Sequence, residues 1–330
     1  MQRIDRRRCL SWLGGSVVLL PSLVRAQAVL PVIGFLGSET EALWRDRVAA
    51  FRQGLADVGY VEGRNVDIVY RWAEGRNDRL PGLARELVDR RIAALVVLGG
   101  TASALAAKDA TTTIPVVFRI AVDPVAAGLV ASLNRPGANV TGVTTMGADL
   151  GPKQLQLLHE LVPAVSEVAL LSNPTNPSIA QVQLRDVPEA ASKLGLRLHV
   201  FNASSENEFE AVFATMRELR VGGLVIGADT FLNARSRELA ALASSLSIPA
   251  ISPYGDFPRA GGLMSYGASI PAASRQAGVY AGRILKGEKP SGLPIQQPIA
   301  FEFVFNAKAA RSLGITPSPS LLSRVDEIIE

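Results

Sequence analysis

Several uncharged hydrogen-bond donors lie where an apolar run of the sequence ends and a helical pattern begins. Residues 93–98 form an unbroken apolar run of strand length, and Gly100, Thr101 and Ser103 follow at the start of an alanine-rich helical segment. Ligands of parallel α/β sheets bind at the carboxyl ends of strands, and the free N–H groups of a helix N-terminus attract anions. We therefore expect these three residues to bind a carboxylate. N-capping of the helix by Thr101 explains the same pattern and is compatible with binding.

The same order of segments returns later in the chain with an acid at its end. Residues 221–230 read VGGLVIGADT, and a helical segment and an Ile-Pro pair follow, as in the first copy. A repeat of this length predicts two copies of one α/β unit. We expect Asp229 to face the carboxylate-binding corner, because a zwitterionic amino acid needs an acid at its other end. N-capping of the next helix is the alternative role for Asp229.

Two further candidates follow strands of the first copy. Ser38 comes at the end of the first predicted strand, in a position similar to that of Thr101. Arg119 ends a buried apolar strand, where a charge must be paired or face a cleft. Arg119 is therefore predicted either to bind a ligand carboxylate or to pair with Asp123, which is itself a candidate for ligand contact.

Three candidates follow strands of the second copy. Asn173 could donate its amide to a ligand, although turn formation is the commoner use of Asn in this position. Tyr254 and Tyr266 could stack on a ligand, although a core aromatic explains either one alone.

The motifs of common enzymes do not occur in the sequence. The two histidines, His159 and His199, lie within a helical and a strand pattern, and no carboxylate spacing beside them indicates a triad or a metal site. Nucleophile-elbow, phosphate-loop and dinucleotide fingerprints are also missing from the sequence. We therefore expect a binding protein with no catalytic residues, no metal and no cofactor.

Strand and helix patterns alternate through the whole chain, which predicts α/β architecture with doubly wound parallel sheets in two lobes. Among the helices expected are a short one from Asp123-Pro124 to Leu133, one in which Pro188 should cause a kink or a break, and one over residues 320–329.

The first 28 residues read as an export signal. Three consecutive arginines, Arg6-Arg7-Arg8, precede an apolar stretch of residues 10–24, and Ala26-Gln27-Ala28 offers a cleavage site after Ala28. An uncleaved membrane anchor is the alternative, and the Arg7-Arg8 pair leaves general and twin-arginine export both open.

Charge and cysteine content agree with an exported protein. The leader holds five arginines and one aspartate, so the formal charge of +4 resides there and the remainder is neutral, which does not indicate nucleic-acid binding. The one cysteine, Cys9, also lies in the leader. A mature chain without thiols suits an oxidising compartment. Two exported lobes in one chain have the architecture of a bilobal solute-binding protein.

A series of short motifs resembles the ABC-transporter substrate-binding proteins of the family that includes tryptophan- and tyrosine-binding lipoproteins. The resemblance covers roughly residues 31–330. The motifs, in order, are IGFL at 33–36, IPVVF at 114–118, DPV at 123–125, NRPGANVTG at 134–142, NP at 173–174, AGGLMSYG at 260–267, ILKG at 284–287 and DEIIE at 326–330.

The resemblance implies a type I periplasmic-binding fold with a three-strand hinge and the ligand between two lobes. By analogy, the chain crosses near Thr145, near Gly267 and at residues 299–305, so that residues 29–146 and 268–295 form lobe 1 and residues 147–267 and 296–330 form lobe 2. The lipoprotein cysteine of the family is absent after the leader, which implies a soluble protein. Arg119 stands where the family has a small or apolar residue, which points to an additional anionic group on the ligand.

These observations predict a monomeric periplasmic protein that delivers a small molecule, an amino acid or an aromatic carboxylate, to an ABC permease. A sensor module of the same fold, read by a membrane kinase or chemoreceptor, is the alternative. Sequence alone does not separate the two.

Overall fold

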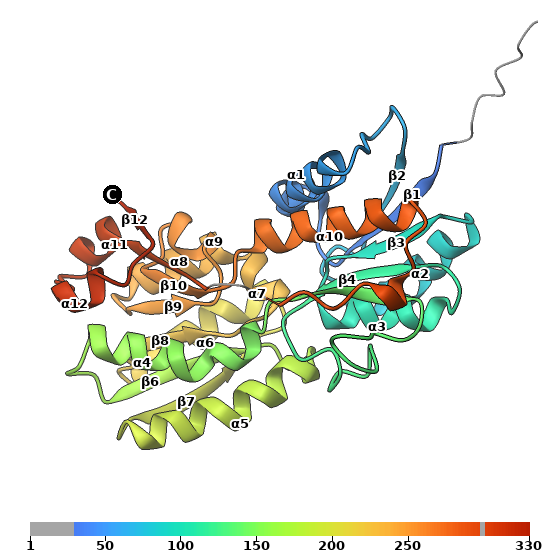
Figure 1. The fold of residues 1–330 in the computed structure, drawn as a ribbon. Coiled ribbons are helices and arrows are strands. Elements are labelled where there is room, and N and C mark those ends of the chain that lie inside the picture. Colours follow the sequence, from blue (N-terminus) through green and yellow to red (C-terminus); the bar gives the residue numbers. More distant parts are fainter. Residues whose placement is uncertain (1–29, 298–300) are drawn as a thin grey trace, which may run out of the picture. The chain divides into compact units, whose positions relative to one another are not determined.

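Two sheets of mainly parallel strands, each flanked by helices, make up the computed structural model of this protein (Figure 1). The structure describes residues 30–297 and 301–330. The predicted export signal, residues 1–28, therefore lies outside the described residues, as does the start of the strand predicted over residues 299–305.

The first sheet has five parallel strands in the order β2-β1-β3-β4-β5 within the described chain. Its central strands β1, β3 and β4 are buried along almost their whole length, as expected of parallel strands covered by helices on both sides. The strands are β1 Val32–Gly37, β2 Asp67–Trp72, β3 Ala94–Val97, β4 Val116–Ile120 and β5 Val140–Thr144.

Helices from both ends of the chain cover the first sheet. Helix α10, Ile270–Leu285, returns from the second sheet to pack beside α1, Glu41–Asp57, on one face (Figure 1). The other helices of this lobe are α2 Leu80–Asp89 and α3 Thr101–Ala110, with the short turns η1 Asn77–Arg79 and η4 Pro290–Gly292. The α1–α10 contact is close because Gly54 and Gly278 leave no side chain between the two backbones.

The second sheet has seven strands in the order β12-β11-β10-β9-β8-β6-β7, of which only the β10–β11 pair is antiparallel in the described chain. The strands are β6 Glu167–Ser172, β7 Arg197–Asn202, β8 Gly223–Ile226, β9 Ala250–Ser252, β10 Met264–Gly267, β11 Glu302–Asn306 and β12 Glu327–Ile329.

The helices of the second lobe enclose two apolar cores, one on each face of this sheet. They are η2 Gly147–Leu150, α4 Gly151–Leu161, α5 Pro177–Lys193, η3 Glu206–Glu208, α6 Phe209–Glu218, α7 Thr230–Ala234, α8 Ser236–Ser245, α9 Asp256–Arg259, α11 Ala307–Ser312 and α12 Pro319–Leu322.

The chain passes three times between the two sheets: after β5, after β10 and after Gln297. The segments that lead into the first and third passages run side by side, since the Thr144 N–H donates to the Gln296 carbonyl at 2.9 Å and the Gln296 N–H donates to the Gly142 carbonyl at 3.0 Å. The two-lobe α/β fold predicted from the sequence is therefore confirmed. The exact lobe boundaries stay a prediction.

Three local predictions need correction. Pro188 does not break its helix, because it lies inside α5, where its missing N–H costs one hydrogen bond to the Leu184 carbonyl. A kink at Pro188 stays a prediction. The segment after Asp123 is a series of turns, because the Asp123 carboxylate accepts the Val125 N–H at 2.8 Å and Gly128 has a φ of 70°. Residues 320–329 form the end of α12 and then β12, which pairs with β11.

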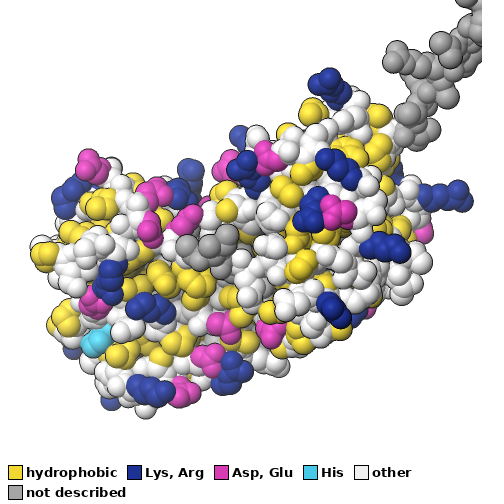
Figure 2. Space-filling view, viewed as in Figure 1, with side chains coloured by type: hydrophobic (Ala, Val, Ile, Leu, Met, Phe, Trp, Pro, Cys, Tyr) yellow, Lys and Arg dark blue, Asp and Glu magenta, His cyan; other side chains and the backbone are white. Residues whose placement is uncertain are grey.

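The described residues contain no helix that is long and apolar enough to cross a membrane. On the face drawn in Figure 2, Lys and Arg side chains are interspersed with Asp and Glu. This mixture agrees with the neutral balance of the chain after its leader.

Candidate functional site

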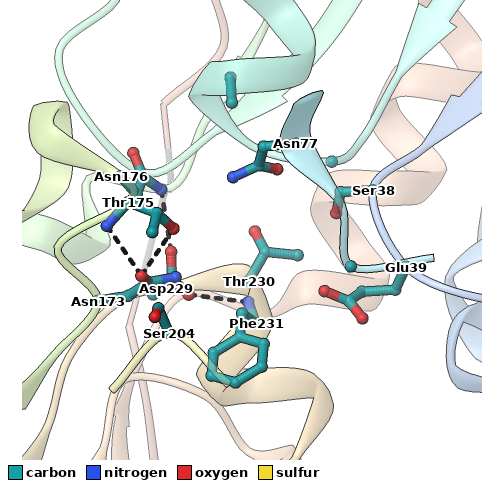
Figure 3. A pocket seen from close by; sticks show the side chains of 13 residues that line it. Ser38, Glu39, Asn77, Asn173, Thr175, Asn176, Ser204, Asp229, Thr230 and Phe231 are labelled. Carbon is teal, nitrogen blue, oxygen red and sulfur yellow. Dashed lines mark hydrogen bonds between the residues drawn. The ribbon is translucent and has the colours of Figure 1, made fainter. Parts of the chain in front are cut away.

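A pocket lies at the carboxyl ends of strands from both sheets (Figure 3). Strand β1 leads to Ser38 and Glu39, β3 to Gly99, β6 to Asn173, and β8 to Asp229. The pocket thus brings together Ser38, Asn173 and Asp229, three of the residues predicted to bind ligand. The full lining is Ser38, Glu39, Gly75, Asn77, Gly99, Ala102, Asn173, Thr175, Asn176, Ser204, Asp229, Thr230 and Phe231.

The Asp229 carboxylate is the centre of the second-lobe side of this pocket (Figure 3). It is 3% exposed and accepts hydrogen bonds from the side-chain amides of Asn173 at 2.9 Å and Asn176 at 3.0 Å. It also caps α7 by accepting the N–H groups of Phe231 at 2.9 Å and Leu232 at 3.3 Å. The N-cap predicted for Asp229 is therefore confirmed.

The Asp229 carboxylate can accept a further hydrogen bond in addition to those that cap α7. Three of the four donors bind Oδ1, whereas Asn176 alone binds Oδ2. An ionised carboxylate has about four acceptor positions, two on each oxygen, so one position on Oδ2 remains. The side-chain oxygen of Asn173 has no acceptor position left, because it accepts both the N–H and the hydroxyl of Thr175.

Buried hydroxyl groups lie at the end of the first sheet. Of the predicted residues there only Ser38 lines the pocket, whereas Gly100, Thr101 and Ser103 do not. The side-chain oxygens of Ser38, Thr101 and Ser103 are buried and lack a hydrogen-bond partner among the described residues. The alternative of N-capping by Thr101 was wrong: Gly100 occupies the N-cap position with a φ of 87°, and Thr101 is the first residue of α3. A Cβ on Gly100 would lie 2.9 Å from the Thr230 hydroxyl of the second lobe, so the two lobes meet here.

Arg119 is 5% exposed and does not line the pocket. Its guanidinium Nη2 donates to the Leu98 carbonyl, at the end of β3. Burial is the main cause that lowers the pKa of Arg119 to about 10. Pairing between Arg119 and Asp123, one of the predicted alternatives, is not among the ion pairs of the described residues, and Asp123 is exposed in its turn.

The two predicted tyrosines lie in different places. Tyr254 is buried close enough to Arg119 for their charges to interact, and burial raises its pKa to about 12. Tyr266 packs against Phe303 in the second-lobe core, with the ring centroids 6.2 Å apart. Neither tyrosine lines the pocket.

An ion pair that the sequence analysis missed joins the two lobes beside the pocket. Arg235, which follows α7, donates to Glu39 at 2.6 Å and to Glu206 at 2.8 Å. Its guanidinium also lies over the Phe231 ring, 4.2 Å from the centroid. Glu39 directly follows the strand-end residue Ser38, which was a usable signal, whereas nothing in the sequence linked Glu39 to Arg235.

A second ion pair crosses between the lobes from α1 to α9. Buried Arg47 donates to Asp256 at 3.0 Å, and Asn233 donates to the same carboxylate oxygen at 3.0 Å. Thr175, Asn176 and Ser204 are further pocket residues that were missed, although the first two lie beside Asn173 in the sequence.

We expect Glu39→Gln to remove a pH dependence of stability. Burial raises the pKa of Glu39 above its ordinary value of 4.5, against the opposing effect of Arg235. A raised pKa in the folded state stabilises it below pH 4.5, and this contribution is lost as the pH rises through the raised pKa. Urea unfolding at several pH values should show the wild-type chain losing stability relative to the Gln variant as the pH rises. A wild-type stability that stays constant or rises with pH, relative to that of the Gln variant, would contradict this account.

The described residues hold no cluster of His, Cys, Asp or Glu suited to a metal ion. Polar side chains from two lobes, placed at the carboxyl ends of parallel strands, define a two-lobed protein that binds a small molecule. Residues 39–329 match the family described as ABC transporter substrate binding protein. The chain belongs to this family.

Individual relatives agree with this membership. A tyrosine-binding protein from Clostridioides difficile (strain R20291) is 25% identical over 266 residues, which are 80% of this chain and 75% of that protein. The structure of a conserved domain protein from Vibrio cholerae is similar with a TM-score of 0.80 and 26% identity, over 91% of this chain and 100% of that one. An ABC domain from Streptococcus pneumonia in complex with L-Trp is similar with a TM-score of 0.79 and 26% identity, over 91% and 100%.

Proposed function

We propose that this protein is exported to the periplasm, where it binds an amino acid or an aromatic carboxylate as a monomer and delivers it to an ABC permease. The observation that carries the proposal is the pocket shared by the strand ends of both lobes, with the Asp229 network on one side and Ser38 on the other. The leader with its A-x-A site supports export. The proteins named for tyrosine binding and for a complex with L-Trp support the ligand class.

The two sides of the site suit the two ends of an amino acid. The remaining acceptor position on the Asp229 Oδ2 can take an ammonium group. The hydroxyls of Ser38, Thr101 and Ser103 can donate to a carboxylate. Because the donors and the acceptor belong to different lobes, a ligand that binds both draws the lobes together, and a closed form of this kind is what a permease can recognise.

Isothermal titration of ligand-stripped protein tests the binding step. Protein unfolded in denaturant, dialysed and refolded is titrated with L-tryptophan, L-tyrosine and 4-hydroxybenzoate. We expect saturable heat with at least one of them. The absence of heat with all amino acids and aromatic acids, from a refolded chain with a native unfolding transition, would overturn the proposal.

A further inference from the structure

Arg119 is a buried charge without an acidic partner among the described residues. It is the penultimate residue of β4, 5% exposed, and its Nη2 donates to the Leu98 carbonyl. Its Nε has no hydrogen-bond partner among the described residues. Burial of a guanidinium is costly unless it is paired and fully hydrogen-bonded, so this arrangement is unfavourable for the free protein.

The acid whose charge acts on Arg119 is already engaged with another cation, because Asp256 pairs with Arg47 at 3.0 Å. Arg47 also opposes the charge of Arg119, since the two positive charges repel each other. No carboxylate of the described chain forms an ion pair with Arg119 itself.

The unpartnered hydroxyls lie at the same corner of the first sheet. Leu98, which accepts from Arg119, directly precedes Gly99. A Cβ on Gly99 would lie 2.2 Å from the Ser103 Oγ and 3.0 Å from the Ser38 backbone N, so the three segments converge on this glycine. Tyr254 of the second lobe is close enough to the guanidinium for the charges of the two groups to interact. Arg119, Ser38, Thr101 and Ser103 together form what we call the first-lobe corner.

We infer that the first-lobe corner binds the carboxylate of the transported solute and that the Arg119 guanidinium is its counter-ion. A carboxylate supplies the acceptors that the Nε and the hydroxyls lack, and its charge balances the buried guanidinium. The inference rests on the proposed function and makes it more specific: Arg119 holds the acid group of the solute, and the amide analogue of the solute is a poor ligand.

The first experiment compares acids with their amides on the wild-type chain. Ligand-stripped protein is titrated with L-tryptophan and L-tryptophanamide, and with 4-hydroxybenzoate and 4-hydroxybenzamide. We expect the acids to bind about 30-fold tighter or more, as for a buried charge pair that loses one partner. Amides that bind as tightly as the acids would overturn the inference while leaving the proposed function intact. No binding of any member, together with no heat from any other amino acid or aromatic acid, would overturn both.

The second experiment separates a ligand-binding role of Arg119 from a structural one. Arg119→Met removes the charge and keeps an unbranched side chain, Arg119→Lys keeps the charge, and Arg185→Met removes an exposed arginine of α5. We expect Arg119→Met to raise the melting temperature of the ligand-free protein, to bind acids about 30-fold more weakly and to lose the preference for acids over amides. Arg119→Lys should keep part of that preference, and Arg185→Met all of it.

A substitution that raises the melting temperature of the free protein but weakens ligand binding identifies a residue whose role is to bind the ligand. A structural Arg119 would give a lower melting temperature in the Met variant with an unchanged acid preference, and this result would overturn the inference. A Met variant that fails to fold would contradict the expected gain in melting temperature. The comparison of acids with amides on the wild-type chain would then decide whether Arg119 binds the carboxylate.

Discussion

Asp229→Ala is expected to lower the free energy of unfolding by about 3 kcal/mol, because one carboxylate holds four donors. Loss of a helix N-cap costs about 0.5–2 kcal/mol, and each buried amide left without an acceptor costs about 1–3 kcal/mol. The affected groups are the α7 N–H groups and the side chains of Asn173 and Asn176. Urea unfolding monitored by circular dichroism measures this loss.

Asp229→Asn is the matched variant. Its side-chain oxygen can still cap α7, but its amide group meets another amide donor at Asn176. We expect about half the loss of the Ala variant. Equal losses would show that the cap contributes little, and no loss in either variant would contradict the central place given to Asp229. Where the solute carries an ammonium group, the Ala variant should also lose about 2–5 kcal/mol of binding.

Gly54→Ala is expected to lower the free energy of unfolding by about 3 kcal/mol through overpacking of the first lobe. A Cβ on Gly54 would lie 1.8 Å from the backbone carbonyl oxygen of Arg275, so α1 and α10 must move apart. This contact cannot be relieved by a side-chain rotation, because the obstructing atom belongs to the backbone. Thermal or urea unfolding measures the effect.

Gly82→Ala is the control for this prediction. Gly82 lies in α2, and a Cβ there would meet nothing within 4 Å. Alanine favours a helix over glycine by about 1 kcal/mol, so this variant should be neutral or more stable than the wild type. Equal effects of the two substitutions would show that the α1–α10 contact is looser than the structure indicates.

The strand ends of the site could be predicted because short-range patterns determine them. Apolar runs followed by glycine and a hydroxyl or acid placed Ser38 and Asp229 at carboxyl ends, and parallel sheets bring such ends to one edge. The cap of α7 followed from Asp229 alone. These inferences need no knowledge of distant contacts.

The rest depends on contacts that sequence patterns do not encode. Glu39 and Arg235 are 196 residues apart, and only the folded chain brings them together. The C-terminal segment has apolar residues at helical spacing, yet Ile328 and Ile329 extend the second sheet beside β11. Strand pairing with β11 therefore determines the structure of this segment, although the spacing of its apolar residues favours a helix.

The repeated α/β unit ends differently in its two copies. The first-lobe corner contains hydroxyls and the unpaired Arg119, whereas the second copy ends in Asp229, which is held by two amides and a helix N-terminus. This difference is the basis on which we propose a ligand with a carboxylate at one end.

Mass spectrometry of the solute carried by natively purified protein tests the central claim most directly. Denaturation should release one kind of small acid in near-equimolar amount, and that acid should rebind to refolded wild-type protein but bind Asp229→Ala and Arg119→Met more weakly. A native protein that releases no solute and whose refolded chain binds no amino acid or aromatic acid would contradict the account, as would a released solute without a carboxylate.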